Sequence, residues 1–131
     1  MKFVIVTNNP KVRDDLGSEF EVDFADITYR EVLCKVRDMI YEGHKLLTHP
    51  LSGSVKPNET PYKSVIVSMV PHQFDSQQAE IIANAIAVFD KFKPIGWELN
   101  ERILRDFQLI DYTLLAGAIG FDATAGLSKK I

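Results

Sequence analysis

The stretch Phe3–Pro10, FVIVTNNP, decides the fold of this chain. Its first half, Phe3–Val6, is a continuous run of β-branched and aromatic residues. Such a run is typical of a strand that is covered on both faces, as in a parallel sheet. Asn9 then fits the N-cap of a helix, with Pro10 at the first helical position, where no backbone N–H is needed. The stretch therefore predicts a buried strand that leads directly into a short helix ending at Gly17.

The residues that follow repeat this alternation of strand and helix. Phe20–Phe24 alternates apolar and acidic residues, which predicts a half-exposed strand at a sheet edge. Thr28 and Glu31 have the spacing of a capping box and predict the start of a helix that ends at Gly43. A further short strand is expected over Lys45–Thr48.

The second half of the chain continues with one strand and several helical segments. Tyr62–Val70 predicts a strand, and Asp75 predicts the N-cap of a long amphipathic helix. Leu99–Phe107 and Asp111–Ile119 predict two further helical segments. We expect Asp111 to cap the second of them.

Together these elements predict an α/β fold, namely a three-layer sandwich with a mainly parallel, Rossmann-like sheet of about four strands. Residues 1–131 are expected to form a single domain, with residues 123–131 as a frayed tail. One connection leaves an alternative open. A parallel crossover usually contains a helix, whereas Pro50–Pro61 has no helical pattern. The strand Tyr62–Val70 could therefore also run antiparallel to its predecessor.

The composition narrows the class of protein. The chain has 131 residues, of which 46% are hydrophobic and 25% charged, as is typical of a soluble globular protein. Its net charge of −3 does not favour a nucleic-acid surface, and its one cysteine excludes an internal disulfide. No apolar run approaches the length of a signal peptide or a membrane-spanning helix. We therefore expect a cytoplasmic protein that binds neither nucleic acid nor membranes.

The candidate binding site follows from the ends of the strands. In open α/β sheets, ligands bind at the carboxyl ends of the strands, and the polar loop Pro50–Pro61 starts at that edge. Lysines, amides and helix N–H groups at this edge favour an anion. We therefore predict a site for a small anionic ligand. Its predicted ligand-binding residues are Thr7, Asn8, Asn9, Thr48, His49, Ser52, Ser54, Lys56, Asn58, Glu59 and Lys63.

The residues do not specify a reaction. Neither GxxxxGK[ST] nor GxGxxG occurs, and no cofactor is expected. His44 and His49 are expected on opposite faces, so no metal site is predicted. An acid–base enzyme using His49 or Glu59 is the alternative to a binding protein, but no second catalytic partner stands at a fixed spacing. The catalytic residues are therefore unassigned, and a binding protein is favoured over an enzyme.

The chain also resembles a known family at the long loop. Residues 35–64, KVRDMIYEGHKLLTHPLSGSVKPNETPYKS, are similar to the signature of the GrdX family, as are VTNNP at residues 6–10 and LIDYTLLAGAI at residues 109–119. Members of this family are small proteins encoded beside the glycine, sarcosine and betaine reductase genes of anaerobic bacteria. The resemblance implies an accessory protein of such a reductase system. It also leaves open an assembly factor that contacts reductase subunits, but it supplies no catalytic residues and no ligand identity. A homodimer is left open independently of the resemblance.

Overall fold

The computed structural model describes residues 2–51, 56, 59–93 and 100–120. Along the chain it contains three strands and four helices within this part. These elements are β1 (Phe3–Thr7), α1 (Pro10–Leu16), β2 (Glu21–Phe24), α2 (Tyr29–Tyr41), β3 (Ser64–Ser68), α3 (Ser76–Lys91) and α4 (Glu101–Ile119). The expected single domain is untested, and its expected tail, residues 123–131, lies outside the described residues.

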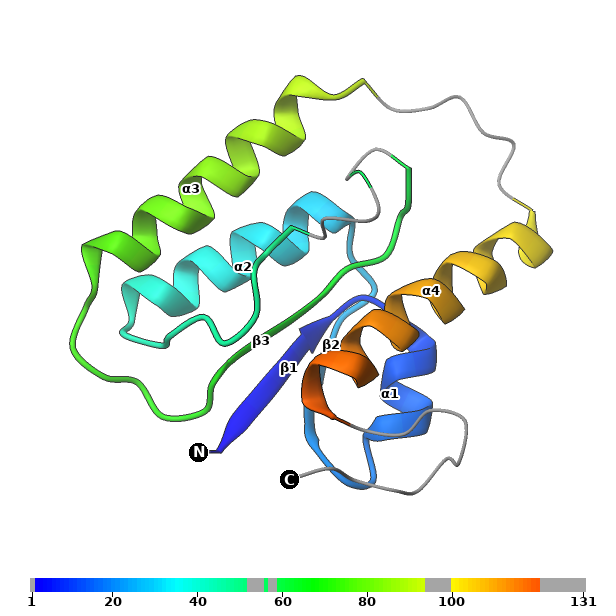
Figure 1. Ribbon diagram of the computed structural model, residues 1–131, viewed down its shortest axis with the longest axis horizontal. Helices are drawn as coiled ribbons and strands as arrows, with labels where there is room; N and C mark the ends of the chain where they lie inside the picture. Colours follow the sequence, from blue (N-terminus) through cyan, green and yellow to red (C-terminus); the bar gives the residue numbers. More distant parts are fainter. Residues whose placement is uncertain (1, 52–55, 57–58, 94–99, 121–131) are drawn as a thin grey trace.

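The sheet is small and mixed, with the strand order β2-β1-β3 (Figure 1). β1 pairs with β2 in parallel, whereas β1 and β3 are antiparallel, with Thr7 opposite Ser64. The expected mainly parallel, Rossmann-like sheet of four strands is therefore wrong. β2 does lie at an edge, as its alternating pattern predicted.

The missing fourth strand explains the difference. Lys45–Thr48 forms only an isolated antiparallel bridge, between Leu46 and Val67 of β3. The ladder ends there because the side-chain oxygen of Thr48, rather than a backbone carbonyl, accepts the hydrogen bond from the backbone N–H of Ile66. Since this segment runs antiparallel to β3, it runs in the same direction as β1. β3 is antiparallel to both of them, which is the alternative that the lack of a helical sequence pattern in Pro50–Pro61 left open.

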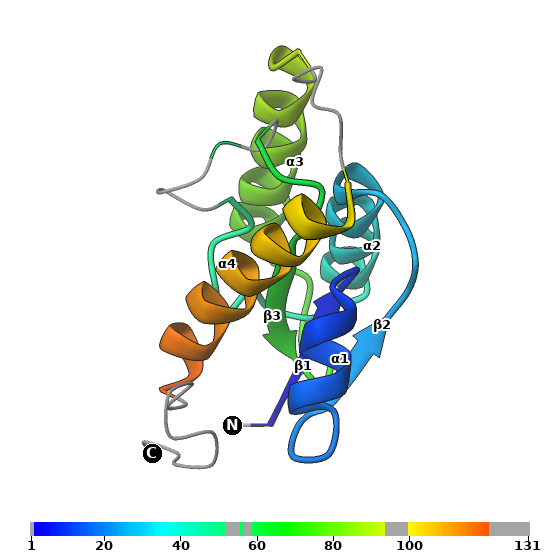
Figure 2. The same cartoon turned by 90° about the vertical axis from the view of Figure 1, so that its right-hand side faces the viewer.

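Helices cover both faces of the sheet (Figures 1 and 2). On one face, Val4, Val6, Val65 and Val67 pack against apolar residues of α2 and α3, which lie side by side. On the other face, Ile5 and Ile66 pack against α1 and α4. Because neighbouring strand residues point to opposite faces, a continuous apolar run is what such double coverage requires.

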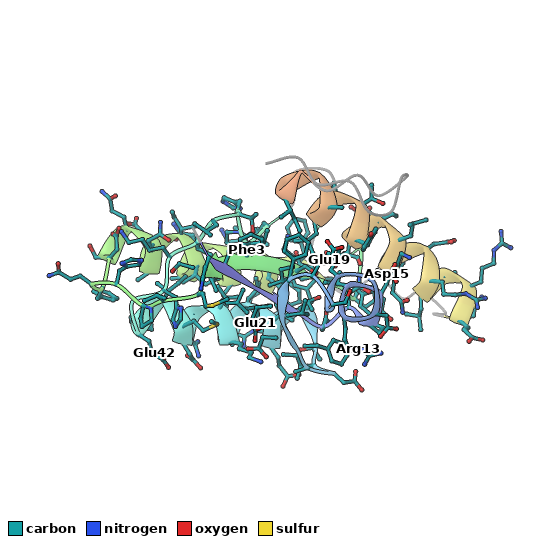
Figure 3. The ribbon with its side chains drawn as sticks, turned by 90° about the horizontal axis from the view of Figure 1, so that it is seen from below. Phe3, Arg13, Asp15, Glu19, Glu21 and Glu42 are labelled. Carbon is teal, nitrogen blue, oxygen red and sulfur yellow. The ribbon has the colours of Figure 1, made fainter. Side chains whose placement is uncertain are left out.

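The N-terminal caps of three helices follow the sequence signals. Asn9 caps α1 with Pro10 in its first turn, Thr28 and Glu31 form the capping box of α2, and Asp75 caps α3. α1 ends at Gly17, as expected. Its outer surface is charged: Arg13 and Asp15 are exposed (Figure 3), and the guanidinium of Arg13 lies over the ring of Phe24 at the end of β2.

The C-terminal part differs from the expectation. Residues 101–119 form one continuous helix whose N-cap is Asn100, not two helices separated before Asp111. Asp111 is not a cap, because it lies in the middle of α4 with its carboxylate turned into the protein. No helix in the described ranges is both long and apolar enough to cross a membrane.

Candidate functional site

A chain of buried hydroxyls connects the sheet to α4. The Thr7 hydroxyl accepts a hydrogen bond from the backbone N–H of Asn9 (2.9 Å) and lies 2.7 Å from the Ser64 hydroxyl. The Ser64 hydroxyl donates to Oδ2 of Asp111 at 2.7 Å. Ser64 therefore uses its one proton on Asp111, and Thr7 donates to Ser64 in turn. The register that pairs Thr7 with Ser64 is what brings these groups together.

Asn9 ties the start of α1 to the same carboxylate. Its Oδ1 accepts from the backbone N–H of Lys11, which makes it the N-cap. Its Nδ2 donates to the carbonyl of Gln108 and, at 3.0 Å, to Oδ2 of Asp111. Asn9 is fully buried, so its amide has all its partners inside the protein.

Asp111 is a buried carboxylate with only 9% of its surface exposed. Burial raises the pKa of Asp111 above its ordinary value of 3.8, because desolvation disfavours the charged form. Hydrogen bonds from Asn9 and Ser64 and the positive charge of Lys63 act in the opposite direction. The carboxylate is thus held by fixed donors in a place where its charge is poorly solvated.

Asn8 connects the end of the loop Pro50–Pro61 to the end of β1 through hydrogen bonds. Its Nδ2 donates to the carbonyls of Ile27 and Pro61, and its Oδ1 accepts from the backbone N–H of Lys63. The backbone N–H of Asn8 also donates to the carbonyl of Lys63. Asn8 therefore sets the position of Lys63 beside the carboxyl end of β1.

A cavity of about 190 Å³ opens beside these groups. It lies between the chain around β3 and one face of α4, and the start of α2 also contributes to it. In Figure 1 the chain that leads into β3 passes between the pair α2 and α3 and the helix α4. The cavity is lined by Tyr29, Thr48, His49, Leu51, Thr60, Tyr62, Lys63, Ser64, Ile110, Asp111, Leu114, Leu115 and Ala118.

Two polar side chains that line the cavity are buried without a hydrogen-bond partner among the described residues. Lys63 is only 7% exposed, and no described residue accepts a hydrogen bond from its ammonium group or forms an ion pair with it. Tyr29 is 4% exposed, and its hydroxyl has no such partner either. Buried polar groups are nearly always hydrogen-bonded in folded proteins, so each of these two needs an explanation.

The electrostatics of both groups reflect this burial. Burial lowers the pKa of the Lys63 ammonium below its ordinary value of 10.5, and the negative charge of Asp111 opposes this shift without cancelling it. Burial, and then the charge of Asp111, raises the pKa of the Tyr29 phenol well above its ordinary value. Both side chains are therefore hydrogen-bond donors that face a poorly solvated space.

The predicted binding residues divide into three groups. Thr48, His49 and Lys63 line the cavity. Thr7, Asn8 and Asn9 lie at the same edge, but their side chains are buried and occupied by the internal hydrogen bonds given above. Lys56 and Glu59 do not line the cavity, and the backbone N–H of Lys56 donates a hydrogen bond to Oε1 of Glu59. Ser52, Ser54 and Asn58 lie outside the described residues.

The geometry does not favour either His49 or Glu59 as an acid–base group. His49 is exposed, and its Nδ1 accepts a hydrogen bond from the backbone N–H of Leu51 at 3.0 Å. The Glu59 carboxylate accepts from the backbone N–H of Lys56. Within the described ranges, no cluster of histidine, cysteine or acidic side chains could hold a metal ion.

Sequence reasoning missed Asp111, Ser64 and Tyr29. The sequence did contain a signal for Asp111. Its neighbours Tyr112 and Leu115 belong to the buried stripe of α4, and a carboxylate in such a place costs free energy unless it has a specific role or specific partners. Ser64 and Tyr29 carried no comparable signal. Ser64 meets Asp111, and Tyr29 meets the rest of the cavity lining, only in the folded protein.

The fold and the cavity define a small mixed α/β protein with a ligand-sized cavity beside a buried lysine and a buried carboxylate. A family model described as "GrdX-like protein" matches residues 4–120. The chain therefore belongs to the GrdX-like family, which confirms the resemblance noted in its sequence. No curated protein and no solved structure is significantly similar to the chain.

Proposed function

We propose that this protein is an accessory protein of a glycine-reductase-type system and that it binds a small anionic ligand in the cavity beside Lys63. Membership of the GrdX-like family suggests the association with such systems. The binding role is supported by the cavity itself. Contact with reductase subunits, by comparison, has no particular surface of the described residues to support it.

The buried ammonium group of Lys63 is the observation that carries the proposal. An ammonium group in a poorly solvated place is unfavourable unless hydrogen-bond acceptors surround it. The described part of the protein supplies none to Lys63, although its side chain lines a cavity. A carboxylate or phosphate in the cavity would supply both the acceptor and the compensating charge, and the Tyr29 hydroxyl could donate to the same anion.

The size and lining of the cavity restrict the ligand. Its volume of about 190 Å³ is below the range of roughly 300–1,000 Å³ that is typical of sites for drug-sized ligands. Ile110, Leu114 and Leu115 make one wall apolar. These features favour a compact metabolite with one anionic group and a short apolar part over a nucleotide.

Thermal unfolding in the presence of small anions tests the proposal. The wild-type protein is titrated with acetate, pyruvate, lactate and inorganic phosphate at constant ionic strength. A ligand that binds the folded state alone raises the melting temperature in a concentration-dependent way. The variant Lys63→Met should bind the effective anion roughly 10- to 150-fold more weakly, because a hydrogen bond to a charged group contributes about 1.5–3 kcal/mol.

Lys91→Met is the matched control, because Lys91 is an exposed lysine at the end of α3 and does not line the cavity. It should bind the same anion as tightly as the wild-type protein does. The proposal is wrong if no anion stabilises the wild-type protein, or if the two variants respond to the anion equally well.

A further inference from the structure

We propose that Lys63 is a nucleophile that forms a Schiff base with a small 2-oxo acid bound in the cavity. The inference rests on the proposed function, because it concerns the same cavity and the same class of anionic ligand. It adds a covalent step that anion binding alone does not require.

The surroundings of Lys63 fit a reactive amine. An amine is a nucleophile only in its neutral form, which a desolvated site favours. Lys63 is buried, lines a cavity with an apolar wall, and has no described side chain that holds it as an ion pair. Lys11, by contrast, forms an ion pair with Asp15 and is partly exposed. Lys63 thus differs from a surface lysine in its burial, in its lack of a partner among the described residues and in its place in the cavity lining.

The reaction needs no oxidant, reductant or further reactant. The lone pair on Nζ of Lys63 attacks the carbonyl carbon of the 2-oxo acid, so a C–N bond forms and the carbonyl π electrons move to the oxygen. A proton moves from nitrogen to oxygen and gives a carbinolamine. This intermediate loses its hydroxyl group as water and leaves a C=N bond. The balance is one amine and one carbonyl compound converted to one imine and one water.

Asp111 is placed to handle the protons of this reaction. It lines the same cavity, and its Oδ2 is fixed by donors from Asn9 and Ser64. A carboxyl group whose pKa is raised by burial can hold a proton closer to neutral pH than a surface carboxyl group can. It can therefore give a proton to the departing hydroxyl group of the carbinolamine and then, as a carboxylate, stabilise the positive charge of the protonated imine.

The lining also explains why a 2-oxo acid fits better than a simple aldehyde. Its carboxylate accepts a hydrogen bond from a donor that would otherwise be unpartnered, namely the Tyr29 hydroxyl. Its carbonyl carbon is bonded directly to the acid group, and Tyr29 and Lys63 line the same cavity. Ile110 and Leu114 accommodate a short alkyl group at the other end.

Reductive trapping tests this step. The wild-type protein is incubated with pyruvate and sodium cyanoborohydride, and the adduct is measured by intact-mass spectrometry and located by peptide mapping. We expect one adduct per chain, on Lys63, with exposed lysines such as Lys91 unmodified under the same conditions. Lactate has the same charge and nearly the same size but lacks the carbonyl group, so it should protect Lys63 from pyruvate and form no adduct.

The variant Lys63→Arg separates the two proposals, because arginine keeps the positive charge but does not form an imine. It should lose the adduct, while the response of the wild-type protein to lactate reports on anion binding. The mapping on the wild-type protein remains decisive even if this variant does not fold. If lactate binds but pyruvate gives no adduct on Lys63, or labels the lysines without preference, the Schiff base is refuted and the binding function stands. If no anion binds and no adduct forms, both are refuted.

Discussion

Replacing Lys63 with methionine should make the free protein more stable. Methionine has a similar length and no charge, so the variant keeps the packing of the side chain and removes only the ammonium group. A buried polar group without a partner destabilises the folded state by about 1–3 kcal/mol, and a charged group lies towards the upper end. The attraction of Asp111 offsets part of this, but burial is the larger effect, because the pKa of Lys63 is lowered overall.

The expected gain can be converted into a melting temperature. A domain of this length has an unfolding entropy such that 1 kcal/mol corresponds to about 4 °C. Lys63→Met should therefore melt about 4–12 °C above the wild-type protein in a calorimetric scan without ligand. Lys91→Met, on the exposed end of α3, should stay within about 0.5 kcal/mol of the wild-type protein.

The pH dependence provides an independent check on the same group. Because the folded-state pKa of Lys63 lies below its ordinary value of 10.5, the unfolded chain binds more protons between the two values. The stability of the wild-type protein should therefore rise with pH as pH approaches 10.5 from below, and this contribution should be missing in Lys63→Met. A variant that is less stable than the wild-type protein, or one whose pH profile matches that of the wild-type protein, would refute the reasoning.

Four other substitutions test the structure, two at the site and two at glycines elsewhere. The wild-type protein should lose stability as pH rises from 3.8 to the higher folded-state pKa of Asp111, because the folded state binds the proton more tightly than the unfolded chain does. Asp111→Asn should not show this loss when unfolding by denaturant is measured at several pH values. Asn9→Ala should destabilise the protein by about 1–2 kcal/mol through the lost cap alone, and by more through the lost bonds to Asp111. Gly43→Ala should destabilise the protein by more than about 1 kcal/mol, because Gly43 has a φ of 108° and a methyl group would meet the carbonyl of His72. Gly117 on α4 has open space around it, so Gly117→Ala should stabilise the protein by about 0.5–1 kcal/mol in the same assay.

Local sequence determined most of the helices and the positions of all three strands. Asn9-Pro10 and the pair Thr28 and Glu31 place helix starts correctly because a cap is a contact between residues three or fewer positions apart. The run Phe3–Val6 identified the central strand, because double coverage of a strand requires apolar residues at every position. The edge position of β2 followed from its alternation in the same way.

The strand directions and the extent of the sheet were decided by tertiary structure. The sequence pattern of Lys45–Thr48 is that of a short strand, but the hydrogen bond from the Ile66 N–H to the Thr48 side chain leaves only a bridge at Leu46. The loop that follows can connect parallel or antiparallel neighbours equally well by length. Which of them forms depends on the pairing of β1 with β3, residues that lie about sixty positions apart in the chain.

The site shows the same division. The sequence placed Thr7, Asn9 and Lys63 at the carboxyl edge of β1, because strand ends and loop ends meet there. It did not distinguish the lysine that lines the cavity from Lys56, which does not. Nor did it distinguish a capping aspartate from a buried one at position 111. Burial and the supply of hydrogen-bond partners set the charge state of a lysine or an aspartate, and for Lys63 and Asp111 both depend on groups that only the folded chain brings together.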